Sequence, residues 1–403
     1  MSDHDNGQVP TLQRPTADDP EEWKAYWEAQ DQPWRTEPEI DAQRQKYLTE
    51  RRAVVSDIEK SIYPFGEIKL NRADVEWLLA THESGLGPVD PSKRYILGHA
   101  RGLDLRGADL CNVNLSGMPL IQLRAGLRNV EWHRATVEQR EKAATHLEGA
   151  SLYRSDLRWS TLRSTHLEGA DLRLANLEGS TFRGAHLEGA DLRLTFFDHK
   201  TVFHDAILGD RKHGFVSLAD VSWNGVNLAV LDWASVKMLG DEQALHKGAL
   251  IEEFRIAVRA NRQLAVALQT QGLNEEASYF AYRAQKIQRA VSRRQKRFGQ
   301  YFFSLFLDLL AGYGYRPGRS VLWYLAVIFG FALAYFAIGH LPFFPDAFVF
   351  SLTSFHGRGF FPGLGNENSL HNPLVVIAAF EAVIGLLIEI SFIATFTQRF
   401  FGR

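Results

Sequence analysis

The stretch that decides the fold is residues 146–195, which reads HLEGA SLYRS DLRWS TLRST HLEGA DLRLA NLEGS TFRGA HLEGA DLRLT. In every block of five residues the second is Leu or Phe, and the last is the small residue Ala, Ser or Thr. The stretch therefore has a period of five residues, with one large and one small side chain at fixed positions in each block.

A second period of twenty residues runs through the same stretch. The block His-Leu-Glu-Gly-Ala recurs at His146, His166 and His186, and internal repeats of this length indicate a solenoid. The stretch resembles the pentapeptide-repeat proteins, and the resemblance implies a right-handed quadrilateral β-helix in which four blocks complete one coil. It also implies that the small residue and the Leu or Phe of each block face the inside of the coil. We expect this solenoid over residues 91–240, with a helical insertion over residues 121–145 that interrupts the earlier repeats from Leu105 to Leu120.

Two apolar runs near the C-terminal end, residues 321–344 and 374–397, predict membrane spans. A helix needs roughly 20 apolar residues to cross the hydrocarbon layer, and each run is longer than that. Basic residues precede the first run and follow the second, whereas Arg358 is the one base between residues 345 and 373. Basic residues stay on the cytoplasmic side, so we expect a multi-pass protein of the cell (inner) membrane with both termini cytoplasmic.

The connection between the two runs predicts a pore loop over residues 345–365. Residues 347–355 form an apolar helix too short to span, with Asp346 as the expected N-cap. A glycine-rich segment follows, and backbone of this kind inside a membrane must be buried in protein or line water. Residues 316–403 resemble the two-transmembrane pore-loop channels of the potassium-channel superfamily. The resemblance implies a homotetramer built from outer helix, pore helix, filter and inner helix.

The filter itself departs from the family consensus Thr-Val-Gly-Tyr-Gly. In register, this chain offers Phe355-His356-Gly357-Arg358-Gly359, so the two glycines are present while the Thr, Val and Tyr positions are changed. The resemblance assigns the selectivity filter and pore loop to the following residues: Ser354, Phe355, His356, Gly357, Arg358 and Gly359.

Two glutamates interrupt the second span. Ionisable residues inside a span are costly and face a cavity or a partner. Glu381 and Glu389 lie eight residues apart, which rotates an α-helix by about 80°, so both fit one broad stripe. The expected pore lining of the inner helix is Glu381, Gly385, Glu389, Phe392 and Phe396. A ring of Glu389 favours cations. A buried Arg358 needs a carboxylate partner, and Glu381 is the expected one.

Helices are expected on both sides of the solenoid. Residues 1–90 are interpreted as a helical and partly disordered region, with helices over 18–30, 37–62 and 72–81. Residues 241–315 predict a helical hairpin broken at Gly272, followed by an interfacial helix over 298–310 beside a basic cluster.

Composition and motifs narrow the function further. The 45 Lys and Arg nearly balance the 47 Asp and Glu, which gives no sign of a nucleic-acid partner. No nucleophile motif, metal-ligand spacing or phosphate loop appears, so neither an enzyme nor a cofactor is expected. The column of His146, His166 and His186 leaves two interpretations open: a site for a metal or for protons, or the exposed face of a duplicated unit.

Together these features predict a multidomain homotetrameric ion channel, cation-conducting through a non-consensus filter and gated or tethered by a cytoplasmic pentapeptide-repeat domain. The expected partners are inorganic ions, the lipid bilayer, further copies of the chain, and an unknown protein or ligand on the solenoid. Two alternatives remain open. One is a non-conducting, membrane-anchored scaffold, and the other is an anion channel if Arg358 faces the pore.

Overall fold

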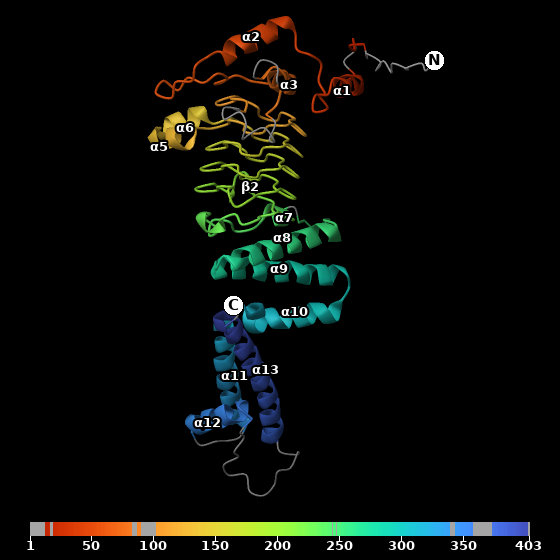
Figure 1. The fold of residues 1–403 in the computed structure, drawn as a ribbon. Helices are drawn as coiled ribbons and strands as arrows, with labels where there is room; N and C mark the ends of the chain where they lie inside the picture. The colour runs from red at the N-terminus through yellow and green to blue at the C-terminus, as the bar shows by residue number, and fades with distance from the viewer. Residues whose placement is uncertain are drawn as a thin grey trace, which may run out of the picture. The chain divides into compact units, whose positions relative to one another are not determined.

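The computed structural model describes residues 13–16, 19–82, 87–89, 102–243, 245–246, 248–338, 343–357 and 373–401. The chain divides into two compact units, Met1–Ala277 and Ser278–Arg403, and each is described by itself. The first unit contains the repeats and the second contains the two long apolar helices (Figure 1).

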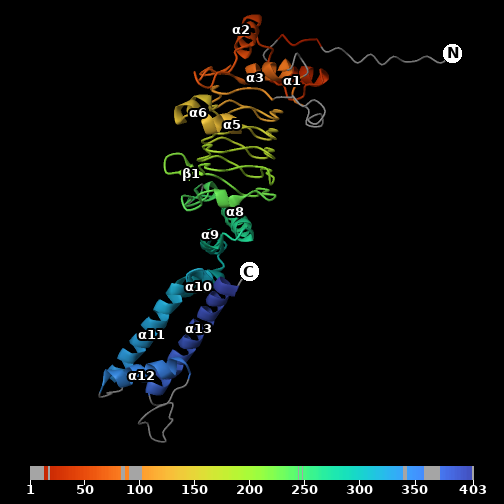
Figure 2. The same ribbon diagram turned by 60° about the vertical axis from the view of Figure 1, so that its left-hand side comes forward.

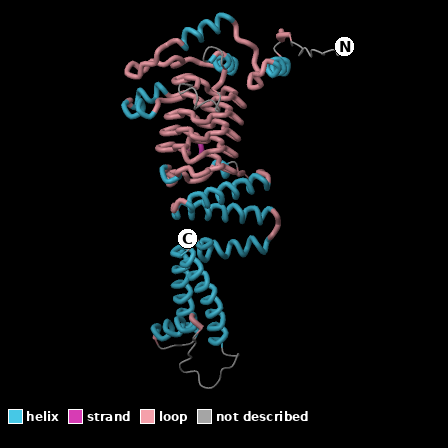
Figure 3. Tube along the Cα trace, in the orientation of Figure 1, coloured by secondary structure: helices cyan, strands magenta, loops and turns pink. Residues whose placement is uncertain are grey.

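The repeats of the first unit form stacked square coils. Parallel backbone bridges join each side of a coil to the next, as at His146↔His166, Ser151↔Asp171, Asp156↔Asn176 and Thr161↔Thr181. These bridges are isolated, so most of each coil consists of turns (Figure 3). The large residues expected inside are fully buried, as Leu152 and Leu172 show, and so are small residues such as Ser160 and Ala170. The period of five therefore correctly predicts both inward positions.

The helical insertion begins later than expected. Residues 121–125 belong to a coil, because Arg124 bridges both Asp104 and Thr161. The insertion consists of α5 (Asn129–Arg134) and α6 (Val137–Ala143), and a capping box between Thr136 and Gln139 begins α6. A second insertion follows the last regular coil, where β1 (Gly209–Asp210) pairs antiparallel with β2 (Gly214–Phe215). This hairpin stands out from the coils in Figure 2.

Among the described residues of the N-terminal region the structure has three helices: α1 (Pro20–Ala29), α2 (Ala42–Arg52) and α3 (Arg72–Ala80). The helix expected over residues 37–62 is only the short α2, because it begins at its Asp41 N-cap and ends before a turn. Lys69 bridges Asp109 of the first coils, and Arg72 donates hydrogen bonds to the carbonyl oxygens of Asn114 and Ser116. This region therefore closes one end of the solenoid.

The other end of the repeats is followed by η3 (Leu228–Val230), α7 (Gly240–Gln243) and α8 (Ile251–Thr270). Arg259 of α8 forms an ion pair of 2.8 Å with Asp220, which lies in the last coil. Gln271, just after α8, donates a hydrogen bond to the carbonyl oxygen of Val226. These contacts hold α8 across the final coil.

The second unit is helical. α9 (Asn274–Arg294) begins after the expected break at Gly272, and α10 (Phe298–Ala311) covers the expected interfacial segment. The turn η4 (Gly312–Gly314) leads into α11 (Pro317–Ile338), α12 (Phe344–Phe355) and α13 (Pro373–Phe401). Within α11 and α13, Gly318–Ile338 and Leu374–Ile393 are long and apolar enough to cross a membrane. These helices run side by side, with α12 at the end away from α10 (Figures 1 and 2).

Candidate functional site

The short helix α12 packs against both long helices of the second unit. It has 12 residues, so it is about 18 Å long and cannot cross a bilayer. Tyr335 of α11, Ala347 and Phe350 of α12, and Ala378 of α13 form one buried apolar cluster. The helix begins at Phe344, with Pro345 in its first turn, so Asp346 lies inside it and is not the expected N-cap.

Glu381 joins the three helices through its carboxylate. Its side chain is fully buried, and it accepts a hydrogen bond of 2.7 Å from the Tyr335 hydroxyl. The Ser351 hydroxyl of α12 lies within hydrogen-bond distance of the other carboxyl oxygen and also 2.9 Å from the carbonyl oxygen of Ile328, and its single proton is shared between the two. A buried carboxylate needs such donors. Glu381 therefore faces α11 and α12 rather than a common stripe with Glu389.

Gly385, one turn further along α13, lies against the last residue of α12. A Cβ atom at this position would lie 2.2 Å from the carbonyl oxygen of Phe355. Phe355 is buried among Ile328, Leu310 and Ile388. Gly385, which is expected to line the pore, thus contacts α12 of the same chain.

A carboxylate oxygen of Glu389 contacts the Nδ1 atom of His356, the residue that follows α12, in a hydrogen bond. The Nε2 atom of His356 lies 3.2 Å from the Tyr324 hydroxyl of α11. Both side chains of the pair remain partly exposed, at 40% for His356 and 36% for Glu389. A carboxylate in a partly hydrated position can attract cations, and of the two glutamates Glu389 alone is accessible.

The remaining predicted site residues fall into three groups. Ser354 and Phe355 are buried in the last turn of α12, and Gly357 adopts a positive φ of +66° just after it. Phe392 and Phe396 are exposed on α13 with stacked rings. Arg358 and Gly359, and with them the expected Arg358–Glu381 pair, lie outside the described residues.

A second polar cluster, which the sequence analysis did not single out, surrounds Asp308 of α10. Arg289 of α9 and Arg319 of α11 form ion pairs of 2.7 and 3.2 Å with it, and the Tyr282 hydroxyl donates at 2.9 Å. Burial alone would raise the pKa of Asp308, but the hydrogen bonds from Arg289 and Tyr282 outweigh it, and its pKa lies below the ordinary value. The sequence feature that could have predicted this cluster is Asp308 itself, the one charged residue in the largely apolar helix α10.

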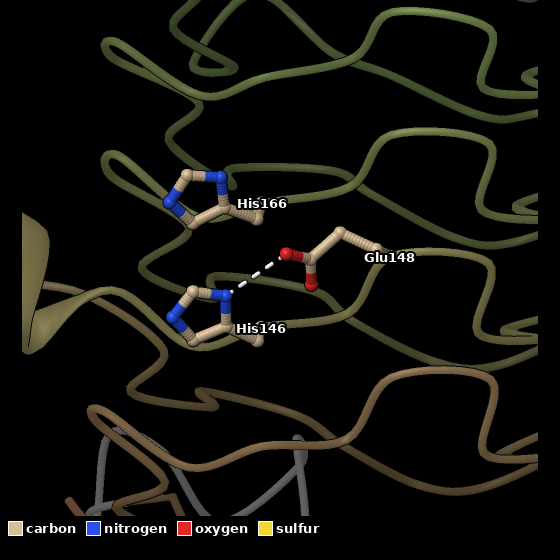
Figure 4. Close-up of side chains that lie close together, drawn as sticks. All are labelled: His146, Glu148 and His166. Atoms are coloured by element: carbon tan, nitrogen blue, oxygen red, sulfur yellow. Dashed lines mark hydrogen bonds and ion pairs between the residues drawn. The ribbon is translucent and has the colours of Figure 1, made fainter. Parts of the chain in front are cut away.

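On the first unit, histidines and glutamates alternate along one face of the solenoid. His146 and His166 stack with ring centroids 4.7 Å apart, and Glu148 lies 2.9 Å from the Nδ1 atom of His146 (Figure 4). The next repeat, His166–Glu168–His186, has the same arrangement. The twenty-residue period thus correctly predicts a column of imidazoles.

Comparison with known proteins identifies the repeats. Residues 144–179 and 162–198 match the family of pentapeptide repeats. Among solved structures, HetL from the cyanobacterium Nostoc sp., a pentapeptide repeat protein involved in heterocyst differentiation regulation, is 25% identical. The match covers 29% of this chain and 52% of HetL, with a TM-score of 0.12. This chain therefore spans only about half the length of HetL.

Two further structures match the same kind of repeat. A pentapeptide repeat protein of the Arabidopsis thaliana thylakoid lumen is 26% identical over 28% of this chain and 73% of that chain, with a TM-score of 0.13. One from the cyanobacterium Cyanothece is 22% identical over 30% and 86%, with a TM-score of 0.12. No curated protein sequence matches the chain.

Proposed function

Because residues 144–198 are pentapeptide repeats and the C-terminal unit holds two helices able to cross a membrane, we propose that the protein is a homotetrameric, cation-conducting channel. The solenoid and its flanking helices are the cytoplasmic part, and they gate or tether the pore. The channel lies in the cell (inner) membrane with both termini cytoplasmic.

The observation that carries this proposal is α12, a helix too short to span that is held between two helices long enough to do so. Its end, at Phe355, abuts Gly385 of α13, and the chain then continues from His356 toward the glycine-rich segment. A non-spanning segment at this depth must be buried in protein or line a water-filled path. Four copies around one axis would satisfy that requirement with the segment at the axis.

The outward faces of the long helices support burial in lipid or against other copies. Large apolar side chains of both helices are exposed in the protomer: Leu322, Phe329, Leu333, Phe380, Val383 and Leu386. Such faces are unstable in water but match the hydrocarbon layer or a neighbouring helix. This supports a membrane assembly rather than a soluble core.

Cation preference is proposed from Glu389. Of the two span glutamates, Glu381 is satisfied inside the protomer, which leaves Glu389 with its carboxylate accessible. Four copies of Glu389 near the axis would attract cations and repel anions. If Arg358 faced the axis instead, anions would be preferred.

The test is ion flux in proteoliposomes that contain the full chain, with assembly checked by cross-linking. We expect potassium flux from the wild type, and at least a several-fold loss of cation-over-anion preference in Glu389→Gln. The matched control is Glu275→Gln, which removes an exposed carboxylate on α9. A wild-type tetramer that assembles but shows no flux would favour the membrane-anchored scaffold. If Glu389→Gln leaves the selectivity unchanged, Glu389 does not determine the preference for cations.

A further inference from the structure

One column of side chains on the solenoid carries an unusual pattern of charge. Backbone bridges place His146, His166 and His186 on successive coils, directly above one another. Two residues after each histidine stands a glutamate, so Glu148, Glu168 and Glu188 form a parallel column beside the imidazoles. Each glutamate contacts the Nδ1 atom of its own histidine, at distances of 2.9, 3.3 and 3.2 Å.

The carboxylates of this column are short of partners. Like charges directly opposite each other on neighbouring strands are destabilising. Glu188 is only 5% exposed, and its Oε2 atom is buried without a hydrogen-bond partner. The same is true of the Oε2 atom of Glu168. A buried carboxylate oxygen without a donor is costly, so this end of the column lacks a positive charge.

The neighbouring elements explain why the deficit lies here. At the other end of the column Cys111 donates to Glu148, and Glu141 of α6 contacts the Nε2 atom of His166. Beyond His186 the backbone bridge leads to the apolar Ile207 on the next coil. The connection between β1 and β2 lies against Gly189, the residue after Glu188, since a Cβ on Gly189 would lie 2.4 Å from the carbonyl oxygen of His213.

We propose that His166, Glu168, His186 and Glu188 bind one divalent transition-metal ion of the zinc class. Imidazole nitrogens and carboxylate oxygens are ligands that Zn²⁺ accepts, and four ligands are the usual number in a structural site. Two neutral imidazoles and two carboxylates exactly neutralise a divalent cation. The ion supplies the charge that the buried oxygens of Glu168 and Glu188 lack.

Ligand atoms of His166, Glu168 and His186 lie within 4.8 Å of one another, and Glu188 joins them through its contact of 3.2 Å with the Nδ1 atom of His186. One oxygen of Glu168 lies 3.3 Å from the Nδ1 atom of His166 and 4.0 Å from that of His186. The two rings are nearly parallel, 4.9 Å apart with 13° between their planes. An ion lies in the plane of its imidazole ligand, so the rings must tilt toward each other on binding, and this torsion is soft.

The site holds one ion per chain. The group His146–Glu148–His166 has similar spacing, but it shares His166, and a neutral imidazole has one free nitrogen lone pair for one ion. The group around His186 is preferred because the carboxylates of Glu168 and Glu188 are more deeply buried than that of Glu148, and each has one oxygen without a hydrogen-bond partner.

Protons compete with the ion for the same nitrogens. The hydrogen bond to Glu188 raises the pKa of His186, with further contributions from the charges of Glu168 and Glu141. Metal binding requires the neutral imidazole.

The test uses the full chain in detergent, purified without a polyhistidine tag and stripped with a chelator. Co²⁺ is titrated in and followed by its visible absorption, Zn²⁺ is added in competition, and bound metal is counted by mass spectrometry. We expect one equivalent per chain, Co²⁺ bands that Zn²⁺ abolishes, and a higher unfolding temperature with Zn²⁺. His186→Ala and Glu188→Gln should each weaken binding by more than about tenfold.

Two variants serve as controls. His204→Ala removes an exposed histidine outside the column, and Glu148→Gln alters the competing group without touching the four ligands. Both should bind as the wild type does. The proposal is overturned if the wild type binds less than one equivalent, or if Glu188→Gln and His204→Ala bind equally. The proposal is also overturned if Glu148→Gln alone loses binding, because the metal would then be bound by the group His146–Glu148–His166. Circular dichroism confirms that each variant is folded.

Discussion

Tyr335 on α11 donates a hydrogen bond of 2.7 Å to Glu381 on α13, and both side chains are completely buried. The two long helices are therefore joined by a polar contact in the middle of an apolar interface. Ser351 of α12 bonds the same carboxylate, so a single side chain fixes all three helices in register. If the proposed pore opens by a movement of α13, then either the three helices move together or the hydrogen bonds to Glu381 break.

Tyr335→Phe should destabilise the C-terminal unit. The substitution leaves one buried oxygen of Glu381 without its donor, which costs about 1–3 kcal/mol of unfolding free energy. Thermal unfolding of the full chain in detergent micelles measures the change. Tyr324→Phe is the matched control because its hydroxyl contacts the partly exposed His356. Equal stability of the two variants would contradict the role given to Tyr335.

Gly385→Ala and Gly330→Ala should have opposite effects. A methyl group at Gly385 would come within 2.2 Å of a backbone oxygen of α12, so α12 must move away from α13. At Gly330 in α11 nothing lies within 4 Å, and alanine favours a helix over glycine by about 1 kcal/mol. The two variants are compared by their unfolding temperature and by the rate at which a protease cleaves residues 343–357. If Gly385→Ala changes neither quantity, α12 and α13 do not meet at Gly385.

Asp308→Asn should destabilise the protein at neutral pH but not in acid. The folded pKa of Asp308 lies below the value of about 4 expected in the unfolded chain. Its stabilising effect is therefore complete above pH 4 and is lost as the pH falls through the lower, folded pKa. Unfolding should differ from the wild type by about 1–3 kcal/mol at pH 7, and the gap should narrow toward pH 3.

The control for this experiment is Asp346→Asn, which replaces an exposed carboxylate on α12. It should match the wild type at every pH. A gap for Asp308→Asn that stays constant between pH 7 and pH 3 would show that the charge of Asp308 does not stabilise the fold.

Asp241→Asn should stabilise the first unit at neutral pH. Burial raises the pKa of Asp241 to about 6, and only one of its oxygens is bonded, by the Leu218 amide at 2.7 Å. The unfolded chain releases this proton near pH 4 and the folded chain near pH 6. Stability is therefore lost as the pH rises across that window and stays lost above it.

The expected gain is on the order of 2 kcal/mol at pH 7.5, and it should disappear near pH 4. Thermal unfolding at the two pH values measures it, with the exposed Asp232→Asn as control. An Asp241→Asn protein that is less stable than the wild type at pH 7.5 would mean that the carboxylate accepts a second strong hydrogen bond.

The repeats were predictable because each block of five contributes the same two buried positions. Ala170 and Leu172 are fully buried, as that pattern requires. The start of the insertion was misplaced because residues 121–125 no longer follow the spacing, although the backbone of Arg124 still bridges its neighbours. Bridges depend on backbone geometry, which tolerates a weak side-chain pattern at the end of a repeat.

The site was predicted less completely. Helical spacing places Glu381 and Glu389 on one broad face, yet Glu381 turns to Tyr335 and Ser351 while Glu389 pairs with His356. Spacing along one helix cannot show which side chains of other helices supply the donors. A Tyr and a Ser inside otherwise apolar segments were the available signal. The Asp308 cluster was missed for the same reason, since Arg289 and Arg319 come from two other helices.

The central claim is that this chain forms a cation pore, and the most direct test is its reversal potential. Purified full-length protein is fused into a planar bilayer under a KCl gradient, and the zero-current voltage is read. A reversal potential displaced toward the potassium equilibrium potential is the predicted result. Displacement toward the chloride potential, or the absence of current from a verified tetramer, would contradict the account.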